Sequence, residues 1–227
     1  SPSTYPPSMM DTIGDEIDEL LLPHDDDDDA QDNQHKSFIT RDAILFAIDA
    51  RTTMLPLALT QALAAAANVM SERALAAESD LVGLVLYGTK HTKPLHADQV
   101  AFDNIHVLVP LEVTAASSIN QLLNIQSNAD FGAFGHADDG DTFRFSSLLW
   151  SVASIFNSTP AAKQCIRRVI VLTNDPEPCT SQEDRAQSLQ RAADLAEQGV
   201  SIIPFFLVPE KGAIFEVGAG SFWRGLV

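Results

Sequence analysis

Basic residues and cysteines are scarce in this sequence of 227 residues. Fourteen lysines and arginines stand against 31 aspartates and glutamates, which gives a formal charge of −17. A chain this acidic lacks the clustered basic face that neutralises phosphates, so it is no free-standing nucleic-acid-binding domain. The only two cysteines, Cys165 and Cys179, are too few for a disulfide-stapled secreted scaffold, and we expect both to be free thiols.

Targeting and membrane-spanning segments are not evident either. The first residues are rich in serine and proline and then acidic, without the basic region and apolar core of a signal peptide. One stretch, Thr52 to Ser71, carries no charge, but it is rich in alanine and contains Pro56, Gln61 and Asn68. It therefore predicts a helix packed in a soluble core, and we expect no membrane contact.

The acidic residues are concentrated at the amino-terminal end. Residues 1–36 hold eleven carboxylates against one cation, Lys36, a charge of −10, whereas 20 acids and 13 bases leave −7 on residues 37–227. With four prolines, a run of five aspartates and few apolar residues, residues 1–36 are predicted to form an acidic disordered tail. Because 45 % of the chain is apolar, residues 37–227 can fold as one α/β domain.

Buried-strand and helical patterns alternate through residues 37–227. Continuous apolar runs predict strands at 43–48, 81–87, 105–109, 169–172 and 200–208. Helical spacing predicts helices at 59–70, 117–125, 146–156 and 183–198. This alternation favours a doubly wound, mostly parallel sheet with helices on both faces, a three-layer α/β fold of the Rossmann type. In such sheets, function is found at the carboxyl ends of the strands.

One of those ends has the outline of a metal site. A strand that ends in aspartate, with hydroxyl residues two and four positions later, builds the Mg²⁺ site of von Willebrand factor A domains. Asp49 and Thr53 fit, but Arg51 occupies the first hydroxyl position and opposes a divalent cation by charge repulsion. Asn174 stands where the later loop should supply an aspartate. We therefore expect a degenerate site that holds no metal, with Asp49 in an ion pair or a helix cap beside Arg51.

No other pattern points to catalysis or to a cofactor. The sequence contains neither a G-x-x-x-x-G-K-[ST] loop nor a G-x-G-x-x-G turn, and residues 88–90 resemble only the end of a phosphate loop. His91, His96 and His106 lack a clear fourth ligand for zinc. No G-x-S-x-G nucleophile elbow is present, so ordinary hydrolase chemistry has no support.

The helix predicted over 183–198 offers a candidate protein contact. Ser181 begins a capping-box pattern before it, and Gly199 ends it. At 100° per residue, the side predicted to face the sheet comprises Leu189, Ala192, Ala193 and Ala196. The opposite side comprises Gln187, Gln190, Arg191, Asp194 and Gln198. This polar, lightly charged face suits either a transient protein contact or plain solvent exposure.

Five segments, taken in order and spacing, resemble one family. They are 42–50 (DAILFAIDA), 84–89 (LVLYGT), 103–108 (DNIHVL), 149–156 (LWSVASIF) and 168–175 (RVIVLTND). Together with the acidic leader, they resemble the amino-terminal, von Willebrand A-like domain of the seventy-kilodalton Ku subunit, in a sequence of fungal type. The resemblance implies a domain that is cut off before the Ku β-barrel.

The resemblance also implies a function. Ku pairs with a larger Ku subunit in a nuclear heterodimer that binds DNA double-strand-break ends, mainly through regions beyond this domain, and recruits non-homologous end-joining factors. It also acts with telomere factors at chromosome ends. Family descriptions add an ATP-dependent helicase label and an abasic-end lyase activity, for which Lys36 lies near the expected lysine. The alternative is a metal-dependent adhesion-type A domain that binds an acidic protein ligand, and Mg²⁺ titration separates the two.

Overall fold

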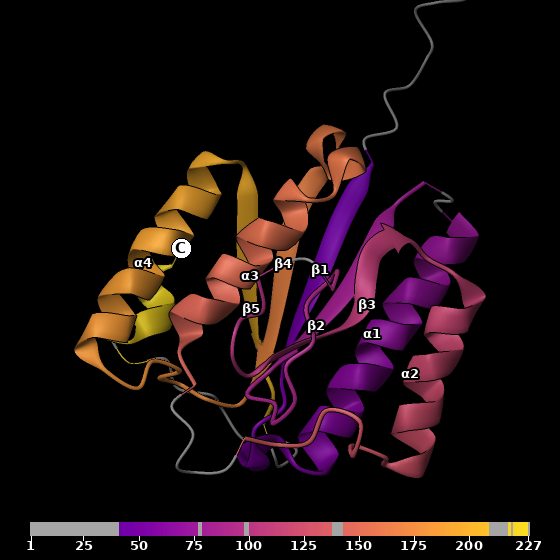
Figure 1. The fold of residues 1–227 in the computed structure, drawn as a ribbon, viewed down its shortest axis with the longest axis horizontal. Coiled ribbons are helices and arrows are strands. Elements are labelled where there is room, and N and C mark those ends of the chain that lie inside the picture. Colours follow the sequence, from indigo (N-terminus) through magenta and orange to yellow (C-terminus); the bar gives the residue numbers. More distant parts are fainter. Residues whose placement is uncertain are drawn as a thin grey trace, which may run out of the picture. The chain divides into compact units, whose positions relative to one another are not determined.

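The chain folds into a sheet of five strands with helices packed on both sides, as shown in Figure 1. The computed structural model describes residues 41–76, 79–97, 100–137, 143–208, 218 and 220–226, so the predicted acidic tail and Lys36 lie outside the described residues. The strands are β1 (Asp42–Asp49), β2 (Leu81–Tyr87), β3 (Ile105–Val113), β4 (Ile166–Thr173) and β5 (Val200–Phe206). The helices are α1 (Leu57–Ala76), α2 (Ala116–Asn128), α3 (Phe145–Asn157) and α4 (Gln182–Glu197), with short 3₁₀ turns η1 (Thr52–Met54), η2 (Pro160–Gln164) and η3 (Phe222–Gly225).

The order of the strands confirms the predicted fold class. The sheet runs β3-β2-β1-β4-β5, and every neighbouring pair is parallel except β2 and β3. The direction of winding reverses between β1 and β4, so the loops after these two strands meet at the switch point where doubly wound sheets bind ligands. All eight residues of β1 are buried, as its unbroken apolar run predicts for a central strand.

Two strands are longer than their apolar runs indicate. β3 continues to Val113, although Pro110 and Glu112 interrupt its hydrophobic pattern. Because β3 is the last strand of the described sheet, its outer edge tolerates a proline that cannot donate a hydrogen bond. β4 begins three residues earlier than predicted, since Arg167 and Arg168 also pair with the neighbouring strands.

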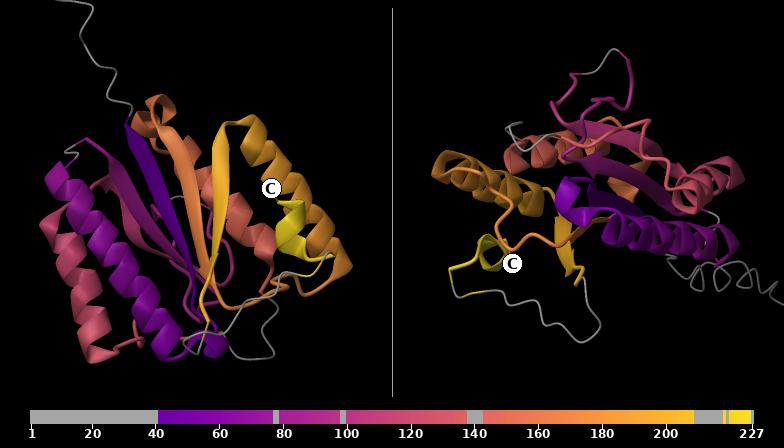
Figure 2. Two further views of the ribbon diagram at one scale, coloured as in Figure 1. Left: turned by 180° about the vertical axis from the view of Figure 1, so that it is seen from behind. Right: turned by 90° about the horizontal axis from the view of Figure 1, so that it is seen from below.

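Each face of the sheet has its own hydrophobic core. One core joins α1 and α2 to the sheet, and the other joins α3, α4 and η3 to the opposite face. Figure 2 shows these three layers from behind and from below. On the first face, Leu59, Leu63, Ala66 and Met70 of α1 are fully buried, which confirms the helical spacing read from the uncharged stretch. Among the described helices, none is long and apolar enough to span a bilayer.

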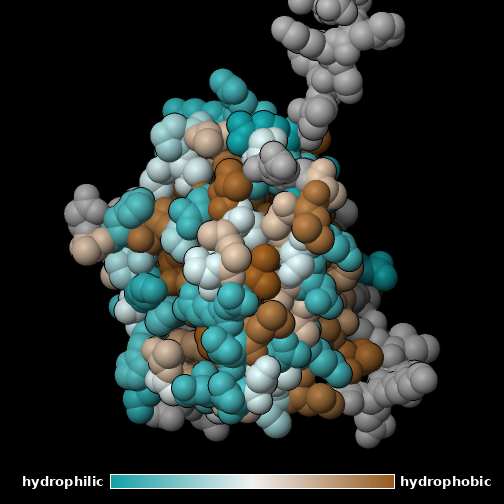
Figure 3. Space-filling view, turned by 90° about the vertical axis from the view of Figure 1, so that its right-hand side faces the viewer, coloured by the Kyte–Doolittle hydropathy of each residue, from teal (hydrophilic) through white to brown (hydrophobic). Residues whose placement is uncertain are grey.

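The surface over α1 and α2 is mixed. Figure 3 shows hydrophobic residues there as separate spots among hydrophilic and neutral ones. Leu123 of α2 is a hydrophobic residue that is 41 % exposed. Apolar side chains that are scattered in this way are ordinary for a soluble surface and indicate no particular partner.

The inward face predicted for α4 is wrong in part. Ala192 is buried, but Ala193 and Ala196 are exposed, and the buried stripe instead contains Asp184, Ser188 and Leu195. The physical reason is the role of Asp184, which is 2 % exposed and accepts hydrogen bonds from the first backbone N–H groups of α3. A polar residue with such a partner can face the core, and a hydrophobic pattern alone assigns it to the wrong side.

Candidate functional site

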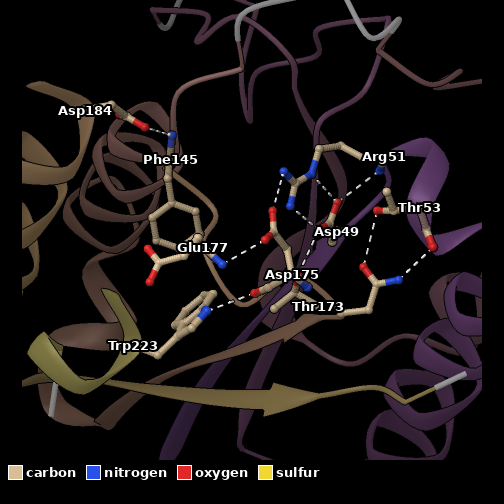
Figure 4. A network of polar contacts seen from close by, with 10 residues as sticks. Asp49, Arg51, Thr53, Phe145, Thr173, Asp175, Glu177, Asp184 and Trp223 are labelled. Atoms are coloured by element: carbon tan, nitrogen blue, oxygen red, sulfur yellow. Dashed lines mark hydrogen bonds and ion pairs between the residues drawn. The ribbon is translucent and has the colours of Figure 1, made fainter. Parts of the chain in front are cut away.

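The candidate site lies at the switch point, where β1 and β4 end side by side. Asp49 is the last residue of β1, and Thr173 is the last residue of β4. Because the two strands are parallel neighbours, their following loops leave the sheet at the same edge. This places Asp49, with Arg51 and Thr53 of the first loop, beside Asn174 and Asp175 of the second. Figure 4 labels all of these residues except Asn174.

Asp49 is a completely buried carboxylate, with an exposure of 0 %. Its Oδ2 accepts a hydrogen bond of 2.8 Å from the hydroxyl of Thr173. Its Oδ1 accepts one of 3.0 Å from the backbone N–H of Arg51. A buried charge is tolerated only when it is paired as well as hydrogen-bonded, so Asp49 needs a cation.

Arg51 supplies that cation from two residues away. Its Nε donates to Asp49 Oδ1 at 3.0 Å and its Nη2 to Asp49 Oδ2 at 2.6 Å, which forms a bidentate pair. Its Nη1 lies 2.9 Å from Asp175 Oδ2, so one guanidinium bridges the loops after β1 and β4 (Figure 4). The carboxylates of Asp49 and Asp175 therefore share one positive charge.

The surroundings fix the guanidinium in place. Its central carbon lies 5.9 Å from the centre of the Tyr87 ring and 5.8 Å from that of Phe143, which is the range of cation–π contacts. Gly88 has a φ of +69°, and any side chain at this position would collide with the aliphatic stem of Arg51. Glycine at 88 thus allows both the turn after β2 and the close passage of Arg51.

The electrostatics favour a permanent positive charge at this position. Burial by itself would lower the pKa of Arg51, but the hydrogen bonds and the charge of Asp49 outweigh it and raise the pKa above its ordinary value. Tyr87 is fully buried, and this burial, together with the negative charge of Asp49, raises the pKa of its phenol well above its ordinary value. Arg51 therefore stays charged and Tyr87 stays neutral across the physiological range.

Thr53 and Asn174 complete the group of predicted residues. The Thr53 hydroxyl donates to Asn174 Oδ1 at 3.3 Å, and Asn174 Nδ2 donates to the Thr53 carbonyl at 2.7 Å. All four residues of the predicted degenerate site thus lie together, but they bond to one another, to Thr173 or to Asp175. In the described ranges, no group of three or more histidine, cysteine, aspartate or glutamate residues is placed to hold a metal ion. With its carboxylates held by a guanidinium, the switch point does not fit Mg²⁺.

The sequence reasoning missed three participants, which are Thr173, Asp175 and Trp223. Thr173 and Asp175 come directly after the strand predicted at 169–172, yet only the fold shows that they bind Asp49 and Arg51. Asp175 also links the site to η3, because its carbonyl accepts a 2.9 Å hydrogen bond from the indole of Trp223. The signal that could have revealed Asp175 is its place directly after a parallel strand next to β1.

The three histidines considered for zinc do not form a site. His106 is buried in β3, where its Nδ1 lies 3.2 Å from the carbonyl oxygen of His91. His91 and His96 are exposed. Burial lowers the pKa of His106, so this ring is neutral at physiological pH.

The residues of the candidate contact face lie along α4. Gln187, Gln190 and Gln198 are exposed, whereas Arg191 and Asp194 are half-buried and form an ion pair of 2.7 Å. The five residues therefore share one side of α4, although two of them also take part in packing.

The fold and the switch point together define the class of protein: a doubly wound α/β domain in which an arginine pairs with the two aspartates at the switch point. A family model described as "Ku70/Ku80 N-terminal alpha/beta domain" matches residues 43–218. Because this match covers most of the chain, the chain belongs to the Ku amino-terminal α/β domain family.

Individual relatives agree with the family match. "ATP-dependent DNA helicase II subunit 1" of Schizosaccharomyces pombe is 27 % identical over 191 residues, covering 81 % of this chain and 30 % of the relative. "ATP-dependent DNA helicase 2 subunit 1" of Rhipicephalus appendiculatus is 28 % identical over 204 residues, covering 85 % of this chain and 32 % of the relative. "X-ray repair cross-complementing protein 6" of Mus musculus is 24 % identical over 199 residues, covering 82 % and 31 %. The chain thus spans about a third of the length of these relatives.

Among solved structures, "von Willebrand factor type A from Catenulispora acidiphila" is similar with a TM-score of 0.46 and 15 % identity, over 73 % of this chain and 33 % of that chain.

Proposed function

We propose that this chain is the amino-terminal interaction domain of a Ku subunit. In this proposal it pairs, within the whole protein, with a larger Ku subunit in a nuclear heterodimer that binds DNA double-strand-break ends. The heterodimer recruits end-joining factors and also acts with telomere factors at chromosome ends. The match of residues 43–218 to the Ku amino-terminal domain is the observation that carries the proposal. The name of the mouse relative, which refers to X-ray repair, supports the same role.

The domain itself contributes little to DNA affinity. Residues 37–227 carry a charge of −7, which repels phosphate. The two adjacent arginines, Arg167 and Arg168, bind to groups of the domain itself. Arg167 donates a hydrogen bond to the carbonyl of Gln198, and Arg168 forms an ion pair of 2.5 Å with Asp42. The exposed basic residues Lys90, Lys93, Arg144, Lys163 and Arg224 do not outweigh this net negative charge. DNA ends are therefore bound mainly by regions beyond this chain.

The contribution of the domain is the recruitment of other proteins through the outer face of α4. Gln187, Gln190 and Gln198 provide exposed amide donors and acceptors there, and the Arg191–Asp194 pair lies beside them. This pattern suits a transient protein contact, which tolerates polar surfaces with little charge. The adhesion-type alternative needs a metal at the switch point, and Arg51 disfavours one.

The first test measures DNA-end binding. The full-length protein, co-purified with the partner subunit, is mixed with blunt linear duplex or with closed circular DNA at physiological salt. We expect tight binding of the linear duplex alone, and weak binding of either DNA by the isolated 227-residue chain. Equal affinity for both DNAs in the heterodimer, or nanomolar end binding by the isolated chain, would contradict the proposal.

The second test concerns α4. Cells carry the full-length protein with Gln187→Ala and Gln190→Ala together, or with Gln121→Ala, an exposed glutamine of α2, as the control. We expect the α4 variant to impair end joining while its loading onto DNA ends persists, because surface changes of this kind leave the fold intact. If joining is unaffected, or if loading falls in parallel with joining, α4 is not the recruiting face.

A further inference from the structure

The surface over α1 and α2 is set apart by its lack of charge. Residues 52–71 and 114–129, which include most of α1 and all of α2, contain no charged side chain, whereas 20 % of the whole chain is charged. At that average, these 36 residues would carry about seven charges. Glu72, Arg73 and Asp130 follow the two stretches and border them. The scattered apolar side chains do not distinguish this surface, but the missing charge does, because charged residues are depleted at the centre of protein interfaces.

The two helices lie side by side on one face of the sheet and share its hydrophobic core (Figure 1). Their outward positions carry amides, hydroxyls and small apolar groups, spaced three or four residues apart so that they form a stripe along each helix. The exposed residues that define these stripes are Gln61, Ala65 and Asn68 on α1 and Asn120, Asn124 and Ser127 on α2. Together the two stripes form what we call the uncharged face.

The side chains of the uncharged face are their own complements. An amide carries N–H donors and a carbonyl acceptor, so it can bind the same amide of another copy, whereas a charged side chain would meet a like charge. A two-fold contact sets one surface patch against the identical patch of a second copy, and it therefore requires self-complementary side chains. A chain with a formal charge of −17 repels its own copies, and this repulsion is least where no like charges come into contact.

The size of the uncharged face suits a weak contact. With a rise of about 1.5 Å per residue, α1 is about 30 Å long and α2 about 20 Å, and packed helices lie about 10 Å apart. The two outward sides then cover roughly 500 Å² on each copy, so a pair of copies would bury about 1,000 Å². This area is at the lower limit for a specific interface and is typical of a transient one.

We propose that the uncharged face of α1 and α2 binds the same face of a second copy of this chain in a weak two-fold dimer. Amides and hydroxyls hydrogen-bond across the contact, Ala65 allows the helices to approach closely, and no ion pair is formed. The inference is independent of the proposed recruiting role of α4, because α4 packs on the opposite face of the sheet.

The first test is sedimentation equilibrium of the 227-residue chain. We expect a monomer–dimer equilibrium that is visible by about 1 mM chain, in keeping with a small interface. Raising the salt from about 0.1 M to 1 M shortens the Debye length from about 10 Å to 3 Å and should strengthen the dimer several-fold, because repulsion is screened and no ion pair is lost. A chain that stays monomeric at every concentration, or a dimer that salt weakens, would overturn the proposal.

Two double variants locate the contact. Gln61→Glu/Asn120→Glu places like charges on the uncharged face, whereas Gln182→Glu/Gln198→Glu places them at exposed positions of α4. Both variants have the same formal charge of −19, two below the −17 of the wild type. We expect the first to weaken dimerisation at least tenfold and the second to change it little, with circular dichroism showing that both are folded. Equal weakening would mean that net charge alone acts, and the proposal would be wrong.

A mixing experiment distinguishes local pairing from net charge. Gln61→Lys/Asn120→Lys lowers the formal charge to −15, and it is mixed with Gln61→Glu/Asn120→Glu. Opposite charges then meet across the contact, so the mixed dimer should be tighter than the dimer of either variant alone. Net charge by itself predicts that the mixed pair binds with intermediate strength, and that result would overturn the proposal.

Discussion

Replacing Arg51 with methionine should destabilise the domain more than any surface change. The variant keeps much of the side-chain volume but leaves the wholly buried carboxylate of Asp49 without its cation. Removal of one partner from a buried ion pair costs roughly 3–5 kcal/mol. Asp49 retains the hydroxyl of Thr173 and the backbone N–H of residue 51 as hydrogen-bond donors, so we expect about 3 kcal/mol, the lower end of that range.

Urea unfolding followed by circular dichroism measures this loss. With a slope of roughly 2–3 kcal/mol per molar urea, the midpoint should fall by about 1–1.5 M. Lys163→Met, at an exposed position of η2, is the control and should shift the free energy of unfolding by less than about 0.5 kcal/mol. Adding Asp49→Asn to Arg51→Met should restore part of the loss, because the unpaired charge is then gone. A cost below about 1 kcal/mol for Arg51→Met would refute the reasoning, since it would mean that Asp49 does not depend on the guanidinium.

Three further predictions concern other buried groups. Asp184→Ala removes two hydrogen bonds from backbone N–H groups and one from a hydroxyl at the start of α3, so the free energy of unfolding should fall by about 2–3 kcal/mol. Glu183→Ala, at an exposed position, should change this free energy little, and thermal melting of both variants tests the difference. Burial lowers the pKa of His106 in the folded chain. The neutral ring therefore contributes fully to stability above the ordinary pKa of histidine, and this contribution is lost as the pH falls from that value through the lowered pKa. His106→Gln should therefore flatten the decrease in unfolding free energy between about pH 7 and pH 5, and an unchanged slope would exclude this role. Burial raises the pKa of Cys179 to about 12, so its thiol should react slowly with a disulfide reagent at about pH 8 in the native chain and rapidly in urea. Mass spectrometry locates the labelled cysteine, and fast labelling of Cys179 in the native chain would contradict this prediction.

Much of the sheet was predictable because its central strands are buried on both faces. β1 and β2 are continuous apolar runs, and such runs leave little choice of structure. The full extent of β3 could not be predicted, because Pro110 and Glu112 are tolerated only in a strand at the edge of the sheet. The sequence does not show which strand lies at the edge. The hydrophobic pattern also could not predict which side of α4 is buried, because Asp184 faces inward only on account of its hydrogen bonds to α3.

The sequence predicted which residues lie together at the site, but not the hydrogen bonds and ion pairs that join them. Asp49, Arg51, Thr53 and Asn174 gather because parallel strands end at one edge, which the sequence pattern implies. That Arg51 also reaches Asp175 depends on the separation of two loops, and that separation is a property of the folded chain. The need for glycine at 88 arises in the same way, from the passage of the Arg51 stem across the end of β2.

Calorimetric titration with Mg²⁺ tests most directly whether this chain is a Ku-type interaction domain with an internal cation. The wild-type chain should give no binding heat, since Arg51 already neutralises Asp49. Arg51→Ser should bind Mg²⁺, because it frees the carboxylate of Asp49 beside the hydroxyls of Thr53 and Thr173. Micromolar uptake of Mg²⁺ by the wild type, lost in Asp49→Ala, would contradict the account and indicate a metal-dependent adhesion domain instead.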